Sequence, residues 1–118
     1  MIEIVLDLPY PPSVNNYYSY TSRGVFIKKH GRDYRKKVVS LFKDGSDAIE
    51  GDLNVHLSVF FPDKRKRDLD NILKCLLDAL THANIYGDDS QIKKLTLEHV
   101  GYQKPDGLVI ATIKEKRC

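Results

Sequence analysis

The sequence predicts one domain of the α+β class, in which two main helices pack on a mixed β-sheet of about four strands. Two periodicities predict it. Some segments alternate apolar and polar residues, as half-buried strands do, and others repeat apolar residues at helical spacing. The 118 residues match the usual length of one domain and contain no internal repeat, low-complexity tract or linker. We therefore expect a single domain over residues 1–118.

The strands of the first half are predicted from alternation. Residues 2–8 alternate apolar and polar side chains, and three prolines after Leu8 end the strand, because proline cannot donate to a β-ladder. Residues 13–24 are predicted to be a polar, aromatic loop, with a short extended piece at 25–27. The clearest strand is 53–61, which alternates throughout and is closed by proline.

Two segments have helical periodicity. Apolar residues recur at i, i+4, i+7 and i+8 over residues 31–43, and a leucine-rich stripe covers residues 69–80. Asp68 or Asp70 can cap the start of the second helix, and Asn84 is a candidate for the left-handed residue after its end.

Residues 92–100 and 108–113 read as the last two strands. Pro105, Asp106 and Gly107 between them are typical of a tight turn, so we predict that these two strands form an antiparallel hairpin. The apolar stretch from Leu95 to Val100 is interpreted as a core strand, with a dimer interface as the alternative.

Composition narrows the class of protein. Hydrophobic residues are 42% and charged residues 30%, which excludes intrinsic disorder. No run of about 18 apolar residues and no signal-peptide pattern occurs, so no membrane partner is expected. The two cysteines fit neither a disulfide framework nor a zinc motif, and free thiols in a cytoplasmic protein are expected.

The charges are unevenly placed. The 19 Lys and Arg exceed the 16 Asp and Glu by only three. Eleven of the 19, six within residues 28–37 and five within 64–74, form two basic tracts. A run of Lys and Arg is commonly a solvated loop, so the tracts alone do not establish a nucleic-acid partner.

The second tract also holds acids. Asp68 and Asp70 are two residues apart and project to one side of an extended helix entry, with Lys74 one helical turn beyond Asp70. Carboxylates repel phosphate, so their place among bases is explained by a metal ion between them and a phosphate. A second pair, Asp88 and Asp89, follows the helix.

Plainer readings of these acids stay open. An Asp at a helix start is commonly only a cap, and Asp88 with Gln91 resembles a capping box. A calcium loop beginning at Asp68 fails, because its sixth position is Leu73 and its twelfth is Ala79.

In this region the chain resembles the RusA family of Holliday-junction resolvases, which is common in bacteriophages and prophages. Its opening, Leu8-Pro9-Tyr10-Pro11-Pro12-Ser13-Val14-Asn15-Asn16, is similar to the family's proline-rich start. The order Arg67-Asp68-Leu69-Asp70-Asn71, then Lys74, Asp78-Ala79-Leu80 and Asp88-Asp89 is similar to its central signature. One departure is Asn84, where the family often has glycine.

The resemblance implies a homodimeric, Mg²⁺-dependent endonuclease that acts on four-way DNA junctions, with Mn²⁺ as a substitute metal. It implies Asp68, Asp70 and Asp89 as catalytic, metal-binding carboxylates and Lys74 as an essential cation. The residues expected to contact DNA are Lys64, Arg65, Lys66 and Arg67, with Asn15 and Lys36 as further candidates.

We hypothesise that the three carboxylates come from one subunit, and that a two-fold dimer makes paired symmetric nicks in recombination or repair. The alternative from another class is a non-catalytic protein that binds branched or single-stranded DNA. A nuclease that acts on flaps or RNA is a further alternative.

Overall fold

The structure, a computed structural model, describes residues 3–12, 18–27, 29–42 and 47–116. The first half contains β1 (Glu3–Leu8), β2 (Tyr18–Thr21), β3 (Gly24–Ile27), α1 (Lys29–Leu41) and β4 (Leu53–Phe61). The second half contains the 3₁₀ turn η2 (Leu69–Ile72), α2 (Leu73–His82), the 3₁₀ turn η3 (Asp89–Gln91), β5 (Ile92–Tyr102) and β6 (Leu108–Glu115). No helix in these ranges is long and apolar enough to cross a membrane.

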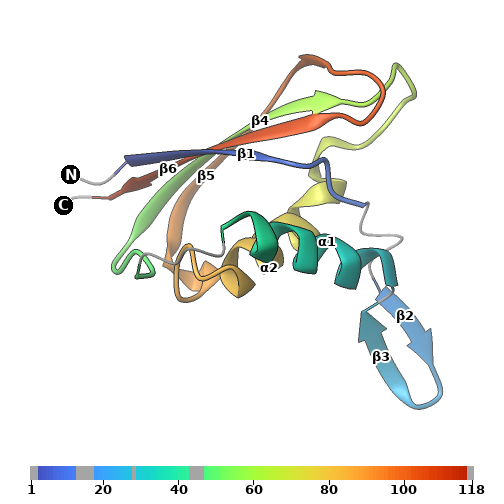
Figure 1. Ribbon diagram of the computed structural model, residues 1–118, viewed down its shortest axis with the longest axis horizontal. Coiled ribbons are helices and arrows are strands. Elements are labelled where there is room, and N and C mark those ends of the chain that lie inside the picture. Colours follow the sequence, from blue (N-terminus) through green and yellow to red (C-terminus); the bar gives the residue numbers. More distant parts are fainter. Residues whose placement is uncertain (1–2, 13–17, 28, 43–46, 117–118) are drawn as a thin grey trace.

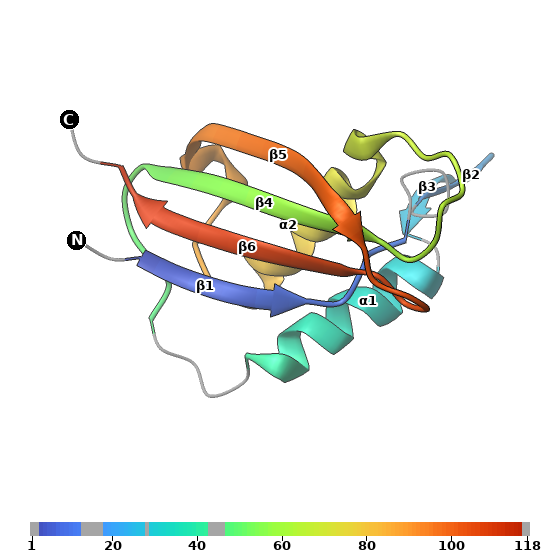
Figure 2. The same ribbon diagram turned by 90° about the horizontal axis from the view of Figure 1, so that it is seen from above.

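Four strands form one mixed sheet in the order β1-β6-β4-β5. Strand β6 is antiparallel to both β1 and β4, whereas β5 runs parallel to β4. Helices α1 and α2 lie together on one face of this sheet (Figures 1 and 2). The predicted fold class, the four-stranded mixed sheet and the two packed helices are therefore confirmed.

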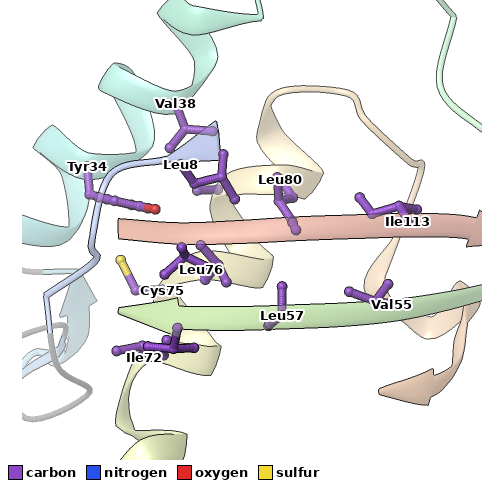
Figure 3. Close-up of a cluster of buried hydrophobic side chains, with 14 of the residues drawn as sticks. Leu8, Tyr34, Val38, Val55, Leu57, Ile72, Cys75, Leu76, Leu80 and Ile113 are labelled. Atoms are coloured by element: carbon purple, nitrogen blue, oxygen red, sulfur yellow. The ribbon is translucent and has the colours of Figure 1, made fainter. Parts of the chain in front are cut away.

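Strand β4 supplies the centre of the core. Its side chains alternate without interruption between buried and half-buried positions, because one face of the strand meets the helices. Strand β6 has the same alternation, and α1 and α2 contribute the residues of their apolar stripes (Figure 3). The largest fully buried side chains are Leu8, Val38, Leu53, Val55, Leu57, Val59, Ile72, Leu76, Leu80, Tyr86 and Ile113.

The predicted hairpin between the last two strands is wrong, because β4 lies between β5 and β6 in the sheet. The burial of the two strands explains their places. Val109, Ala111 and Ile113 of β6 are fully buried and belong at the sheet centre, whereas β5 is exposed along most of its length. The apolar stretch from Leu95 to Val100 is thus part of an edge strand and not of the core, with Leu95 39% and Val100 50% exposed.

The connection from β5 to β6 passes across the end of β4. The amide of Gln103 donates to the carbonyl of Phe61, and the amide of Gly107 donates to the carbonyl of Gln103. Gly107 has a positive φ of 78°, and a Cβ there would come within 2.9 Å of Tyr10 Cβ. The turn residues that suggested a hairpin therefore serve this crossover.

The first loop also departs from expectation. Residues 18–21, predicted to be loop, form β2 and pair with β3 in a separate two-stranded sheet around a two-residue turn. Tyrosine and threonine favour strands, and Gly24 has the positive φ that tight connections use. The extended piece predicted at 25–27 is confirmed, as is the left-handed conformation of Asn84, whose φ is 61°.

We predict that Leu57→Ala, at the centre of β4, lowers the free energy of unfolding by about 2–5 kcal/mol, since it removes buried methyl groups and leaves a cavity. Urea unfolding followed by circular dichroism measures the change. Val5→Ala is the control, because Val5 is 60% exposed in β1. Equal losses in the two variants would contradict the central place of β4 in the core.

Candidate active site

An ion pair closes the connection between β4 and η2. Arg67 Nη1 donates to Asp63 Oδ1 at 2.6 Å, and Nη2 donates to Asp63 Oδ2 at 3.2 Å. The amide of Arg65 also donates to Asp63 Oδ1 at 2.8 Å. The hydrogen bonds from Arg67 and Arg65 lower the pKa of Asp63 to about 2. Asp63 thus stays ionised and fixes the loop that leads directly to Asp68.

Asp68 and Asp70 lie at the start of η2, and both are exposed. Asp68 has the extended backbone of a capping residue, but its side chain makes no capping hydrogen bond. The alternative that Asp68 serves as a side-chain cap is therefore wrong, and its carboxylate is not occupied at the helix terminus. Both carboxylates remain accessible to a ligand.

Asp68 borders a surface cavity of about 620 Å³. The cavity lies between the segment after β1 and the connection that follows β4. Its lining combines a tyrosine, prolines, three basic residues and an amide: Tyr10, Pro11, Pro12, Pro62, Arg65, Lys66, Arg67, Asp68, Asn71 and Ile72. The basic tract and one of the predicted catalytic acids thus share one hollow.

Aromatic residues support the rear of this region. Tyr10 packs edge-on against Phe61 with ring centroids 6.2 Å apart, and the Arg67 guanidinium lies 5.8 Å from the Phe61 centroid. His99 lies 4.3 Å from Phe61 and 5.2 Å from Tyr102 by ring centroids. Phe61 therefore links the cavity to the end of the edge strand β5.

Lys74 lies in the first turn of α2, and its Nζ is 3.6 Å from Asp78 Oδ1 one turn further along. The pair is partly exposed, with 48% of the Lys74 side chain accessible. An exposed i,i+4 pair of this kind contributes little to stability. The cation can consequently exchange Asp78 for a phosphate at small cost.

Asp89 is positioned by a capping box. Asp88 accepts from the amide of Ser90, and Gln91 Oε1 accepts from the amide of Asp88 at 2.9 Å. Gln91 Nε2 also donates to the carbonyls of Ile49 and Gly51. The predicted capping box is therefore confirmed. Both aspartates are exposed, and the cap uses the carboxylate of Asp88, which leaves Asp89 as the candidate ligand of this pair.

The predicted metal ligands lie at the two ends of α2. Asp68 and Asp70 precede the helix, whereas Asp89 follows it and η3 contacts its other end (Figures 1 and 2). The ten residues of α2 span about 15 Å. Within the part of the chain that the structure describes, no three His, Cys, Asp or Glu side chains are grouped to hold a metal ion. One chain thus brings Asp68 near Asp70 but leaves Asp89 apart.

The predicted DNA-contacting residues divide into three sets. Lys64, Arg65 and Lys66 are exposed on the loop beside Asp68, and Arg65 and Lys66 line the cavity. Lys36 is exposed on α1, a separate surface, and Asn15 lies outside the described residues. Because the Asp63 carboxylate already pairs with Arg67, the uncompensated positive charge of the loop resides on its three neighbours.

Sequence reasoning assigned no role to two residues of this region, Asp63 and Tyr10. The spacing of Asp63 and Arg67, four residues apart, was a usable signal, but such a spacing indicates an ion pair only where the chain is known to turn. Tyr10 carried no signal beyond its place in a proline-rich segment, because its neighbours Phe61 and Gly107 are distant in sequence.

Exposed carboxylates beside a cavity with basic walls are typical of enzymes that hydrolyse phosphodiesters with bound metal ions. These are the side chains that a hydrolase of nucleic acids would need at its site.

Comparison with known proteins narrows the class to a family. The family described as Endodeoxyribonuclease RusA matches residues 9–112. The chain is 37% identical over 117 residues to the crossover junction endodeoxyribonuclease rusA of Enterobacteria phage HK97, covering 98% of this chain and 97% of that relative. It is 35% identical to the RusA enzyme of Shigella sonnei strain Ss046 and 34% identical to that of Escherichia coli strain K12, each over 89 residues and 74% of both chains.

The chain belongs to the RusA family of endodeoxyribonucleases, and it is an enzyme that hydrolyses phosphodiester bonds of DNA. The resemblance inferred from the residue order Arg67 to Asp89 is thereby confirmed.

We predict that Arg67→Ala raises the pKa of Asp63 from about 2 toward 3.8, measured by NMR titration of its carboxyl carbon. The folded pKa of Asp63 lies below the unfolded value, so the pair stabilises the fold above about pH 4 and is lost as pH falls toward 2. Lys64→Ala, which removes a neighbouring charge but no hydrogen bond to Asp63, is the control. An unchanged pKa in Arg67→Ala would show that the ion pair does not form.

Proposed function

We propose that this chain resolves four-way DNA junctions as a homodimer, making paired symmetric nicks that depend on Mg²⁺, with Mn²⁺ as a substitute. The relatives are named crossover junction endodeoxyribonucleases, which supports the substrate. The observation that carries the chemistry is the pair of exposed carboxylates, Asp68 and Asp70, beside a cavity with basic walls.

The residues at η2 fit a hard divalent cation. Asp68 and Asp70 offer carboxylate oxygens, the donors that Mg²⁺ prefers, and both face solvent rather than a cap. When bound, such an ion supplies a nucleophilic water and neutralises charge on the phosphate. Asp68 and Asp70 are therefore assigned to hold the metal, with Asp89 as the third carboxylate.

The basic residues act on the phosphodiester itself. Arg65 and Lys66 line the cavity and attract the DNA backbone, while Lys74 offsets negative charge that grows as water adds to phosphorus and the P–O bond breaks. Arg67 serves mainly to hold the loop, since Asp63 already occupies its guanidinium. The hydrolysis consumes one water and leaves one phosphate monoester and one hydroxyl at each nick.

Asp89 reaches the metal site from the partner subunit in this proposal. The described part of one chain does not group Asp68, Asp70 and Asp89 into a metal site, so the proposal replaces the expectation of a one-subunit site. Strand β5 is a sheet edge whose backbone is unpaired on one side within the described residues, and it exposes Leu95, Val100 and Tyr102.

The proposal pairs two β5 edges about a two-fold axis. Such strands run antiparallel, so the start of one β5 meets the end of the other. Asp89 precedes the start of β5. By contrast, η2 contacts β5, and the Arg67 guanidinium lies over the ring of Phe61, which is close to the end of β5. The partner's Asp89 would then lie on the side of η2 and complete two equal sites.

We predict that Asp70→Asn abolishes nicking of a four-way junction in Mg²⁺ but retains junction affinity in EDTA within about threefold, since it removes a metal ligand and no phosphate contact. Gel assays compare a four-way junction, a flap, a linear duplex and an RNA hairpin, with and without Mg²⁺. Asp7→Asn on β1, at the opposite edge of the sheet from β5, is the control for loss of one exposed carboxylate charge.

Cleavage of the flap or RNA ahead of the junction would replace the proposed substrate. Full cleavage by Asp70→Asn would remove the metal role, and binding by the wild-type chain without any cleavage would favour the non-catalytic DNA-binding alternative.

Mixed dimers test the composite site. We predict that Asp70→Asn and Asp89→Asn are each inactive, and that their co-expressed heterodimer regains nicking, because one of its two sites then contains only native carboxylates. Nicking of one strand per junction on a sequencing gel is the measurement. The heterodimer of Asp68→Asn with Asp70→Asn is the matched control and stays inactive. An inactive Asp70→Asn/Asp89→Asn heterodimer would contradict the composite site and favour a site formed by all three acids of one subunit.

A further inference from the structure

The cavity beside Asp68 is larger than contact with one phosphate requires. Its volume of about 620 Å³ lies within the range of about 300–1,000 Å³ that encloses small organic ligands. It is formed by segments far apart in the sequence, from Tyr10 to Asn71. A groove that only follows a DNA backbone has no need of such a volume.

The wall of the cavity is chemically divided. Tyr10, Pro11, Pro12, Pro62 and Ile72 form an apolar part. Arg65, Lys66, Arg67, Asp68 and Asn71 form a polar part on the side of η2. A nucleotide has the same division, because the faces of its base are apolar and aromatic, the base edge forms hydrogen bonds, and the phosphate is anionic.

The apolar wall is held from behind before any ligand arrives. Tyr34 donates its hydroxyl to the carbonyl of Pro9 at 2.7 Å, which fixes the chain entering the Tyr10–Pro12 segment to α1. The Tyr10 ring is packed against Phe61, and Gly107 lies close behind its Cβ. The Asp63–Arg67 ion pair fixes the opposite wall. A preformed pocket loses little conformational entropy on binding.

We propose that this cavity binds the nucleobase of a nucleotide adjacent to the cleaved phosphate, with the base against Tyr10 and its edge facing Asn71. The inference rests on the proposed function, since Asp68 lines the cavity and places its occupant next to the cleaved bond. The phosphate of the same nucleotide faces Arg65 and Lys66. Asn71 carries both a donor and an acceptor, so it makes the site responsive to base identity.

This occupant accounts for a requirement for branched DNA. A base within a continuous duplex must be unstacked before it enters a pocket, at a cost of a few kcal/mol. In this proposal a base beside the branch point, where the continuous helix is interrupted, is unstacked at a lower cost. The cavity thereby couples junction structure to base preference at the nicked position. The competing reading is a channel for the backbone alone, which is indifferent to the base.

A double-mutant cycle that combines substitutions in the protein with removal of bases from the DNA tests the proposal. A set of junctions carries an abasic residue at each nucleotide flanking the nicked phosphate, one position per junction. Binding in EDTA and nicking in Mg²⁺ are measured for the wild-type chain, Tyr10→Ala and Asn71→Ala. For the wild-type chain, one abasic position is expected to weaken junction binding about 5- to 150-fold, the range for a single base–aromatic stack. Tyr10→Ala is expected to bind the intact junction more weakly by a similar factor. Removing the base as well is expected to weaken its binding no further.

Asn71→Ala provides a second arm, since Asn71 is half-buried on η2 and its side chain is smaller than the Tyr10 ring that packs against Phe61. It is expected to level the nicking rates among junctions that differ only in the flanking base. Leu41→Ala is the control, because Leu41 is 54% exposed at the end of α1 and lies outside the cavity lining. It keeps the full abasic penalty.

The base pocket would be overturned, and the backbone channel left, by two results together. The losses of binding affinity from base removal and from Tyr10→Ala would be additive, and Asn71→Ala would keep the base preference of the wild-type chain. The binding measurements in EDTA distinguish failure of the base pocket from failure of the proposed function, because they do not require cleavage. Coupling in EDTA without nicking by the wild-type chain would retain the pocket and refute the nuclease assignment to junctions.

Discussion

Strand β4 is the element on which the rest of the structure depends, because both of its edges are hydrogen-bonded and every second side chain is buried from Leu53 to Phe61. Pro62 follows Phe61 and cannot donate to a β-ladder, so the strand ends and the chain leaves the sheet there. The crossover from β5 to β6 passes over the same end, and Tyr10 packs against it. The cavity is thus a consequence of where β4 stops.

Electrostatics refine this scaffold locally. The Asp63 carboxylate takes up Arg67 and anchors the loop, so the positive charge that remains for DNA belongs to exposed neighbours such as Arg65 and Lys66. An ordered loop can hold Asp68 at the cavity edge without using its side chain as a cap. The acids that reduce the net charge to +3 therefore include a structural member, Asp63, beside those proposed as metal ligands.

The positions of the acids also connect folding to symmetry. Helix α2 separates Asp68 and Asp70 from Asp89, and the capping box at Asp88 holds Asp89 firmly at the far end. A subunit built in this way is complete as a fold. In the proposed dimer its chemistry is complete only beside a second copy, which would tie cleavage to an assembly with the two-fold symmetry of a four-way junction.

The sequence by itself determined what depends on near neighbours in the chain: the alternation of β4, the stripe of α2, the capping box at Asp88, the left-handed Asn84 and the motif that marks the family. Only the tertiary structure decided that β5 is a parallel edge strand, that β6 fills the sheet centre, and that Asp68, Asp70 and Asp89 are not grouped as a metal site within the described residues of one chain. The reason is physical. Periodicity and capping act over two to four residues, whereas strand order reflects which apolar faces compete best for one shared core.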